Sequence, residues 1–192
     1  MKTQQILCAA VFWCSTTNCL AHELPDNRLT LVMRESHHVT MTFYINYIDA
    51  LHDALSPKSS EQEFMLAYST MTPQAFQKEL QRAQAQFQTA TKITLRSGKE
   101  ATISNWAWPD AARVQAQLQE RVVQALVAPT AHIHTAPSEV RAEIKSNNAM
   151  DAIKLHLPEE FQPVTVVSYR PSQIMIKPKA PALWIKFAAA QP

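Results

Sequence analysis

Apolar and polar residues alternate along two neighbouring segments near the start of the chain, 29–33 and 39–47, and a polar turn at 35–37 separates them. Side chains that alternate with a period of two lie on opposite faces of a β-strand. In both segments the apolar residues fall on one face, which predicts a β-hairpin with a single buried face. A second hairpin is expected over KITLRSGKEATI, where the turn contains Gly98, the only glycine of the chain. A turn that needs a positive φ favours glycine.

Between the two hairpins the apolar period changes to about 3.6 residues, the period of an α-helix. Ser60 followed by Glu63 forms a capping-box pattern, and Pro73 opens a longer helix. We therefore expect helices near 60–90, and a further amphipathic helix at 110–127. The apolar residues expected to face the core from the last two helices are Phe76, Leu80, Ala83, Phe87, Val114, Leu118, Val122 and Leu126.

From residue 137 the chain returns to short segments typical of strands, each bounded by Pro, Asn or Ser residues. These segments are 138–146, 151–158, 163–171, 172–178 and 182–187. The pattern predicts an α+β, mainly β fold: an immunoglobulin-like β-sandwich of about seven to nine strands with a helical insertion. We expect one domain over 22–187 and a frayed tail at 188–192. The residues expected to be buried together are Leu31, Met41, Phe43, Ile45, Ile93, Val166, Ile176 and Ile185.

Residues 1–21 have the pattern of a cleaved signal peptide, with Lys2 ahead of a short apolar run and small residues before His22. All three cysteines, at positions 8, 14 and 19, lie in this leader, so the processed chain forms no disulfide. The apolar run is too short to span a bilayer, and we expect export to a Gram-negative periplasm with no membrane span after cleavage. Eighteen Lys and Arg nearly balance sixteen Asp and Glu, so nucleic acid is not an expected partner.

Four segments, AHELPDN, YINYIDALHDAL, MTPQAFQKELQRAQ and ITLRSGKEATI, follow one another over residues 22–105. In this layout the chain resembles the soluble periplasmic domain that precedes the membrane domain of HupE/UreJ-type proteins, the hydrogenase and urease accessory class. The resemblance implies a stand-alone periplasmic relative that lacks the membrane helices, and it implies a link to nickel. It maps no metal site onto particular residues of this chain.

Three histidines form a candidate metal site. Cleavage of the leader makes His22 the first residue, and its amino nitrogen and Nδ1 can then bind copper together. His132 and His134 are two positions apart, so in an extended segment both rings project from one side. The three residues together resemble a histidine brace for copper or nickel. The competing interpretation is that His132 and His134 belong to a polar loop between two prolines and that the terminal residue binds nothing.

The other four histidines are expected to have structural positions. His37 and His38 fall in the predicted hairpin turn and are expected to be solvated. His52 and His156 lie beside apolar strand residues and are expected to pack against them rather than bind a metal.

The sequence contains no motif of a known catalytic class. The processed chain has no cysteine nucleophile, there is no Gly-x-Ser-x-Gly elbow, and one glycine cannot build a phosphate-binding loop. Trp106 and Trp108 alternate onto one face and either stack on a sugar ring or, as we expect, pack beneath a neighbouring helix. We therefore favour a non-enzymatic exported binding domain without a cofactor, whose partner is a protein such as a membrane transporter or an assembly component. The alternative is a periplasmic protein that binds copper or nickel.

Overall fold

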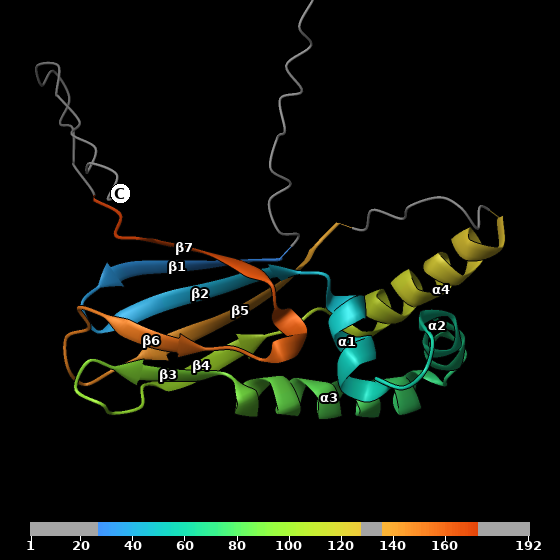
Figure 1. The fold of residues 1–192 in the computed structure, drawn as a ribbon, viewed down its shortest axis with the longest axis horizontal. Coiled ribbons are helices and arrows are strands. Elements are labelled where there is room, and N and C mark those ends of the chain that lie inside the picture. Colours follow the sequence, from blue (N-terminus) through green and yellow to red (C-terminus); the bar gives the residue numbers. More distant parts are fainter. Residues whose placement is uncertain (1–26, 128–135, 173–192) are drawn as a thin grey trace, which may run out of the picture.

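The structure, a computed structural model, describes residues 27–127 and 136–172. Within those residues the chain forms two β-sheets and four α-helices, and the helices gather at one end of the larger sheet (Figure 1). The elements in chain order are β1 (Asn27–Glu35), β2 (His38–Ile45), α1 (Tyr47–Leu55), α2 (Glu61–Ser69), α3 (Pro73–Ala90), β3 (Lys92–Leu95), β4 (Thr102–Ala107), α4 (Ala111–Val127), β5 (Ser138–Lys145), β6 (Ile153–His156), the 3-10 helix η1 (Glu159–Phe161) and β7 (Val164–Tyr169).

The larger sheet has five strands in the order β4-β5-β2-β1-β7. The pairs β1–β2, β2–β5 and β4–β5 are antiparallel, whereas β1 and β7 run parallel. The predicted first hairpin is confirmed as β1 and β2, with Glu35 opposite His38 at the turn. Its apolar face is buried as expected, at Leu29, Leu31, Val39, Met41, Phe43 and Ile45.

The smaller sheet pairs β3 with β6 and lies in front of the larger sheet in Figure 1. Gly98 has a φ of 82° in the turn after β3, where its N–H donates to the carbonyl of Leu95. The second hairpin is shorter than predicted, because the chain returns alongside β3 over Lys99, Glu100 and Ala101. The following residues enter the larger sheet as its edge strand β4. This hairpin therefore links the two sheets.

The helices begin where the capping residues predict. Ser60 and Glu63 form the complete capping box of α2, and the hydroxyl of Thr72 accepts a hydrogen bond from the N–H of Ala75 at the start of α3. Asp110 accepts backbone hydrogen bonds in the first turn of α4. The predicted inner face of α3 is confirmed as buried. On α4 the prediction holds for Val114 and Leu118, is only partly met at the half-buried Val122 and is wrong for Leu126, which is 79% exposed.

One helix has no counterpart in the sequence-based prediction. The alternating pattern of β2 continues in the sequence through Tyr47, but the chain instead starts α1 there. Asn46 lies between the strand and the helix and provides an N-cap position. Tyr47 is 1% exposed and packs with the core from the helix, so its burial follows from a helical position and not from a strand face.

The mixed α+β class is confirmed, with seven strands in the described residues, but the immunoglobulin-like sandwich is not confirmed. A single cluster of buried side chains joins the larger sheet, the helices, Ile93 of β3 and Phe161 of η1. The prediction that Val166 is buried is wrong, because it is 47% exposed on the edge strand β7. Ile176, Ile185 and the strands predicted at 172–178 and 182–187 lie outside the described residues, apart from Ser172.

Candidate functional site

The three histidines of the candidate metal site, His22, His132 and His134, all lie outside the described residues. The strands that follow them are described, however, and fix where the chain enters the sheet. Four residues separate His22 from the start of β1, and three separate His134 from the start of β5. β1 and β5 begin at the same end of the larger sheet, the end that adjoins the helices (Figure 1).

The strand register gives the distance between the two entry points. Arg28 of β1 lies opposite Tyr44 of β2, and Tyr44 lies opposite Glu139 of β5. Two strand spacings separate Arg28 from Glu139, which corresponds to about 10 Å. A connection of five extended residues spans up to about 17 Å. The described entry points of the two segments are thus closer together than the length of such a connection.

Beneath these entry points lies a polar network that the sequence analysis missed. Arg121 of α4 is 5% exposed, and its guanidinium donates to Asp49 Oδ1 at 2.9 Å and to Asn46 Oδ1 at 3.0 Å. Glu61 Oε1 lies 3.6 Å from the same guanidinium. The N–H of Asn46 in turn donates to Asn27 Oδ1 at 2.8 Å. A buried cation thus connects the starts of β1, α1 and α2 to α4.

The position of Arg121 was visible in the sequence. It lies three residues after Leu118 and seven after Val114, both of which face the core, so the helical period places Arg121 on the buried side. A buried guanidinium needs charged or polar partners, and α1 and α2 provide them. Its role is to hold the helices together, because these partners are side chains of the fold.

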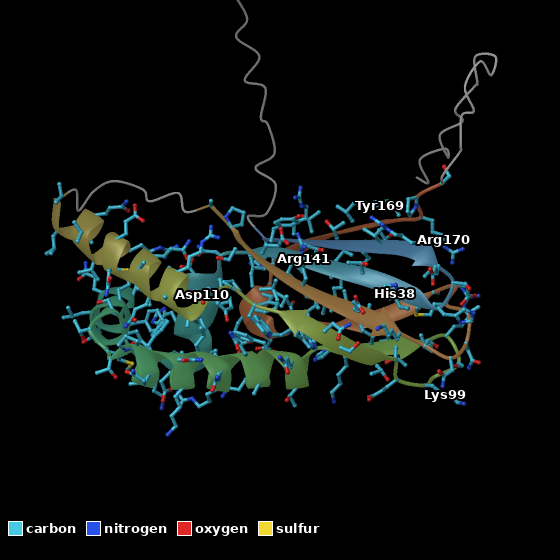
Figure 2. The ribbon with its side chains drawn as sticks, turned by 180° about the vertical axis from the view of Figure 1, so that it is seen from behind. His38, Lys99, Asp110, Arg141, Tyr169 and Arg170 are labelled. Carbon is cyan, nitrogen blue, oxygen red and sulfur yellow. The ribbon has the colours of Figure 1, made fainter. Side chains whose placement is uncertain are left out.

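A polar hollow of about 810 Å³ lies at the opposite end of the sheet, between the β1–β2 turn, the turn after β3 and the end of β5. Figure 2 shows His38 and Lys99 at this end, away from the helices. His38 Nε2 lies 3.6 Å from Glu143 Oε2. The same carboxylate accepts hydrogen bonds from Lys145 Nζ at 2.9 Å and Asn105 Nδ2 at 2.7 Å.

Glu143 is the centre of this hollow's charge network. The hydrogen bond from Lys145 and then that from Asn105 lower the pKa of its carboxyl group. Asn105 has a positive φ of 53° where the register of β4 and β5 shifts, and this bulge brings its side chain to the carboxylate. Within the described ranges no group of three His, Cys, Asp or Glu residues is placed so that it could hold a metal ion.

The remaining histidines differ in how well they were predicted. His37 is exposed in the turn as expected, whereas His38 is the half-buried first residue of β2. His52 is packed as expected, but in helix α1: its ring centroid lies 5.0 Å from that of Phe64 and its Nε2 is 2.9 Å from the carbonyl oxygen of Ser59. The prediction that His156 is packed is wrong, because it lies exposed on β6.

The two tryptophans of the candidate sugar platform pack into the protein. Their rings are stacked with centroids 5.2 Å apart, and Trp106 also stacks on Phe43. Trp108 lies 6.0 Å from Tyr47 and 6.1 Å from Phe87 of α3. The expected position beneath a helix is therefore confirmed for Trp108, whereas Trp106 packs on Phe43 of β2 and on Trp108.

Large apolar side chains are exposed in the described chain singly at Leu66 of α2 and as groups in two further places. The first is the α4 stripe, which we define as Val123, Leu126 and Val127, with 58%, 79% and 80% of their surfaces exposed. The second is β7, where Val166, Val167 and Tyr169 are exposed. The two places lie toward opposite ends of the molecule, the α4 stripe among the helices and β7 along the edge of the sheet (Figure 1).

Comparison with models of protein families, with curated proteins and with solved structures finds no match for this chain. The resemblance to HupE/UreJ-type domains thus stays a prediction. Among the helices of the described residues, none has the length and apolar character needed to cross a membrane.

Proposed function

We propose that this chain is a non-enzymatic, exported binding domain that contacts a protein partner through the α4 stripe. The observation that carries the proposal is the spacing of Val123, Leu126 and Val127. They lie at positions i, i+3 and i+4 and therefore on one face of the last two turns. A helix that presents apolar residues at this spacing fits an apolar groove on another protein. Partner contacts of this kind gain free energy by removing exposed aliphatic surface from water.

The first turns of α4 anchor the helix to the rest of the fold, which leaves the α4 stripe of its last turns available. Val114 and Leu118 are fully buried, and Gln115 and Gln119 donate to carbonyl oxygens at the end of α2. The last turns project beyond these anchored turns (Figure 1). The partner is a protein and not a small molecule, because the α4 stripe is a convex helix surface.

The proposal includes export to the periplasm and cleavage before His22, as the leader pattern predicts. It also includes an immunoglobulin-like sandwich. The seven described strands and the two strands predicted at 172–178 and 182–187 would make nine. Mass spectrometry of protein recovered from the periplasm of an expressing Gram-negative host tests the cleavage site, and a mature chain that starts elsewhere contradicts it.

The partner surface is tested by crosslinked pull-down from periplasmic and membrane extracts of the source cells. The variant Leu126→Glu/Val127→Glu changes the α4 stripe, and Leu66→Glu is the matched control, since Leu66 is a 58% exposed leucine on the neighbouring α2. We expect the stripe variant to lose a specific partner that the unchanged chain and the control both retain. Equal capture by all three chains would show that the α4 stripe is not the contact surface.

A metal-binding protein is the second candidate function, and the shared entry point of β1 and β5 favours it. His22, His132 and His134 approach the sheet from segments whose first paired residues are about 10 Å apart. Copper would be held by the terminal amino group and imidazole of His22 together with the two other rings. Nickel, which the resemblance implies, accepts the same nitrogen ligands.

Calorimetry with Cu²⁺ and Ni²⁺ on correctly processed protein separates the two candidates. A metal site requires deprotonated nitrogen ligands, so its affinity should fall as the pH drops through the imidazole pKa of about 6.5. An added N-terminal Met should abolish such binding and His134→Ala should weaken it. We expect no binding, or weak binding that survives the added Met. Submicromolar affinity that both changes reduce would instead make this a metalloprotein.

A further inference from the structure

An apolar groove opens between the two sheets at the end of the molecule away from the helices. We define it by six residues that line it: Leu31, Met33, Val39, Ile153, Leu155 and Val166. Its volume is about 460 Å³, and its rim carries the polar residues Asp151, Ser168 and Arg170. A volume of this size is in the range of cavities that hold a small molecule or several side chains.

In the described residues β7 forms an open edge of the larger sheet with apolar side chains exposed. Among the described strands β7 is the outermost of the larger sheet, and its one partner in that part of the chain is β1. Val166 lines the groove but is 47% exposed, although its apolar character predicts a place in the core. Open strand edges with exposed valines are usually covered or paired in folded proteins.

The chain leaves the described region at the rim of the same groove. Arg170 lines the groove, and its guanidinium donates to the carbonyl of Met150 at 2.9 Å, which holds the end of β7 beside the smaller sheet. Twenty residues, 173–192, follow Ser172. Even a fraction of that length reaches the whole groove, since an extended residue spans about 3.3 Å.

The sequence of this segment has the character of an apolar strand pair. Ile174 and Ile176 alternate with polar or flexible residues, and Leu183, Ile185 and Phe187 alternate with Trp184 and Lys186. In an extended conformation a period of two would place Ile174 and Ile176 on one side, and likewise Leu183, Ile185 and Phe187. Because the segment is joined covalently to the groove's rim, its local concentration there exceeds that of any separate ligand.

We propose that residues 173–187 of the same chain fill the apolar groove and cover Val166, with the side chains of Ile176 and Ile185 against its walls. A second copy of the chain, or an apolar molecule from solution, would occupy the groove only if this segment did not. The inference is independent of the α4 stripe, which lies at the other end of the molecule (Figure 1).

Crosslinking tests the contact directly in the full chain with its three cysteines replaced by serine. Two double-cysteine variants are made: one joins Val166→Cys to Ile185→Cys, and the other joins Val167→Cys to Ile185→Cys. The yield of intramolecular crosslink with a short bismaleimide is compared between them by mass spectrometry. Val167 is a matched control because it neighbours Val166, is 41% exposed and is absent from the groove lining. Adjacent strand residues face opposite ways, so we expect at least about fivefold more intramolecular crosslink at position 166. Equal yields, or crosslinks only between two chains, would overturn the proposal.

Stability measurements provide a second readout that needs no crosslinker. We expect Val166→Glu to lower the urea midpoint of the full chain at least about three times as much as Val167→Glu, because only the first buries a charge. When Val166→Glu is added to the double variant Ile176→Glu/Ile185→Glu, it should lower the urea midpoint little further, because the side chains that cover Val166 are already lost. That variant should also bind anilinonaphthalene sulfonate, and the unchanged chain should not. Additive losses, or dye binding by the unchanged chain, would show that the groove has a different occupant or none.

Discussion

Replacement of Phe43 by alanine is the sharpest test of the core. Phe43 has no exposed surface, lies edge-on to Phe161 with ring centroids 5.4 Å apart and stacks on Trp106 at 6.4 Å. Truncation of a packed phenylalanine costs about 3 to 5 kcal/mol from lost burial and the cavity left behind. Each ring pair accounts for about 0.5 to 1.5 kcal/mol of such a loss. The cavity should persist, because the strands on both sides of β2 are paired along their length.

Urea unfolding followed by far-ultraviolet circular dichroism measures this loss without depending on the fluorescence of Trp106. Tyr44→Ala is the matched control, since Tyr44 is the next residue of β2 on the opposite face, with the Arg28 guanidinium 4.7 Å from its ring centroid. We expect that control to cost about 1 kcal/mol or less. A loss below about 1 kcal/mol for Phe43→Ala, or one no larger than for Tyr44→Ala, would refute the assignment of the buried face.

Three further substitutions test the turn, a helix cap and a buried phenol. Gly98→Ala should destabilise the protein by about 1 kcal/mol in thermal unfolding, because a φ of 82° strains an L residue. The added methyl group itself meets no atom within 4 Å. An unchanged stability would show that the turn does not require a positive φ at this position. Ser60→Ala should cost about 1 kcal/mol. The backbone N–H of Ser60, and to a lesser extent its hydroxyl, donate hydrogen bonds that lower the pKa of the Glu63 carboxyl group. The stabilisation from this cap is therefore fully present above the ordinary glutamate pKa and is lost as the pH falls through the lowered pKa. A carboxyl titration by NMR that is the same in Ser60→Ala would contradict this coupling. Burial raises the pKa of Tyr47 above its ordinary 10.0, so its stabilising effect is full below that pH and disappears as the pH rises through the raised value. Tyr47→Phe should therefore move alkaline unfolding to higher pH, and an unchanged midpoint in circular dichroism would count against it.

Local patterns predicted the elements whose formation depends on nearby residues. The β1–β2 hairpin, the capping box at Ser60 and the inner face of α3 all follow from periods and caps that a short window of sequence contains. The start of α1 was missed because Tyr47 continues the alternation of β2 by chance. A single polar residue, Asn46, marks the change from strand to helix, and no strong capping pattern accompanies it.

Features that depend on strand order could not be read from the sequence. Val166 has the character of a core residue, but its exposure is set by the position of β7 at the edge of the sheet. The hollow around Glu143 likewise requires the pairing of β5 with both β2 and β4, which brings His38 and Asn105 to one carboxylate. The candidate metal histidines were chosen by residue type alone, and the register of β1 and β5 limits only how far apart their segments enter the sheet.

The parallel pairing of β1 with β7 has a consequence for how the chain folds as it is made. Asn27 lies opposite Val164, so one edge of β1, the first described strand, is paired only when β7, the last described strand, is present. Contacts between such distant residues require the closure of a long loop and slow the folding of a domain. A chain that is synthesised from its N-terminus can therefore form the β1–β2 hairpin early. It can complete the larger sheet only after β7 has been synthesised.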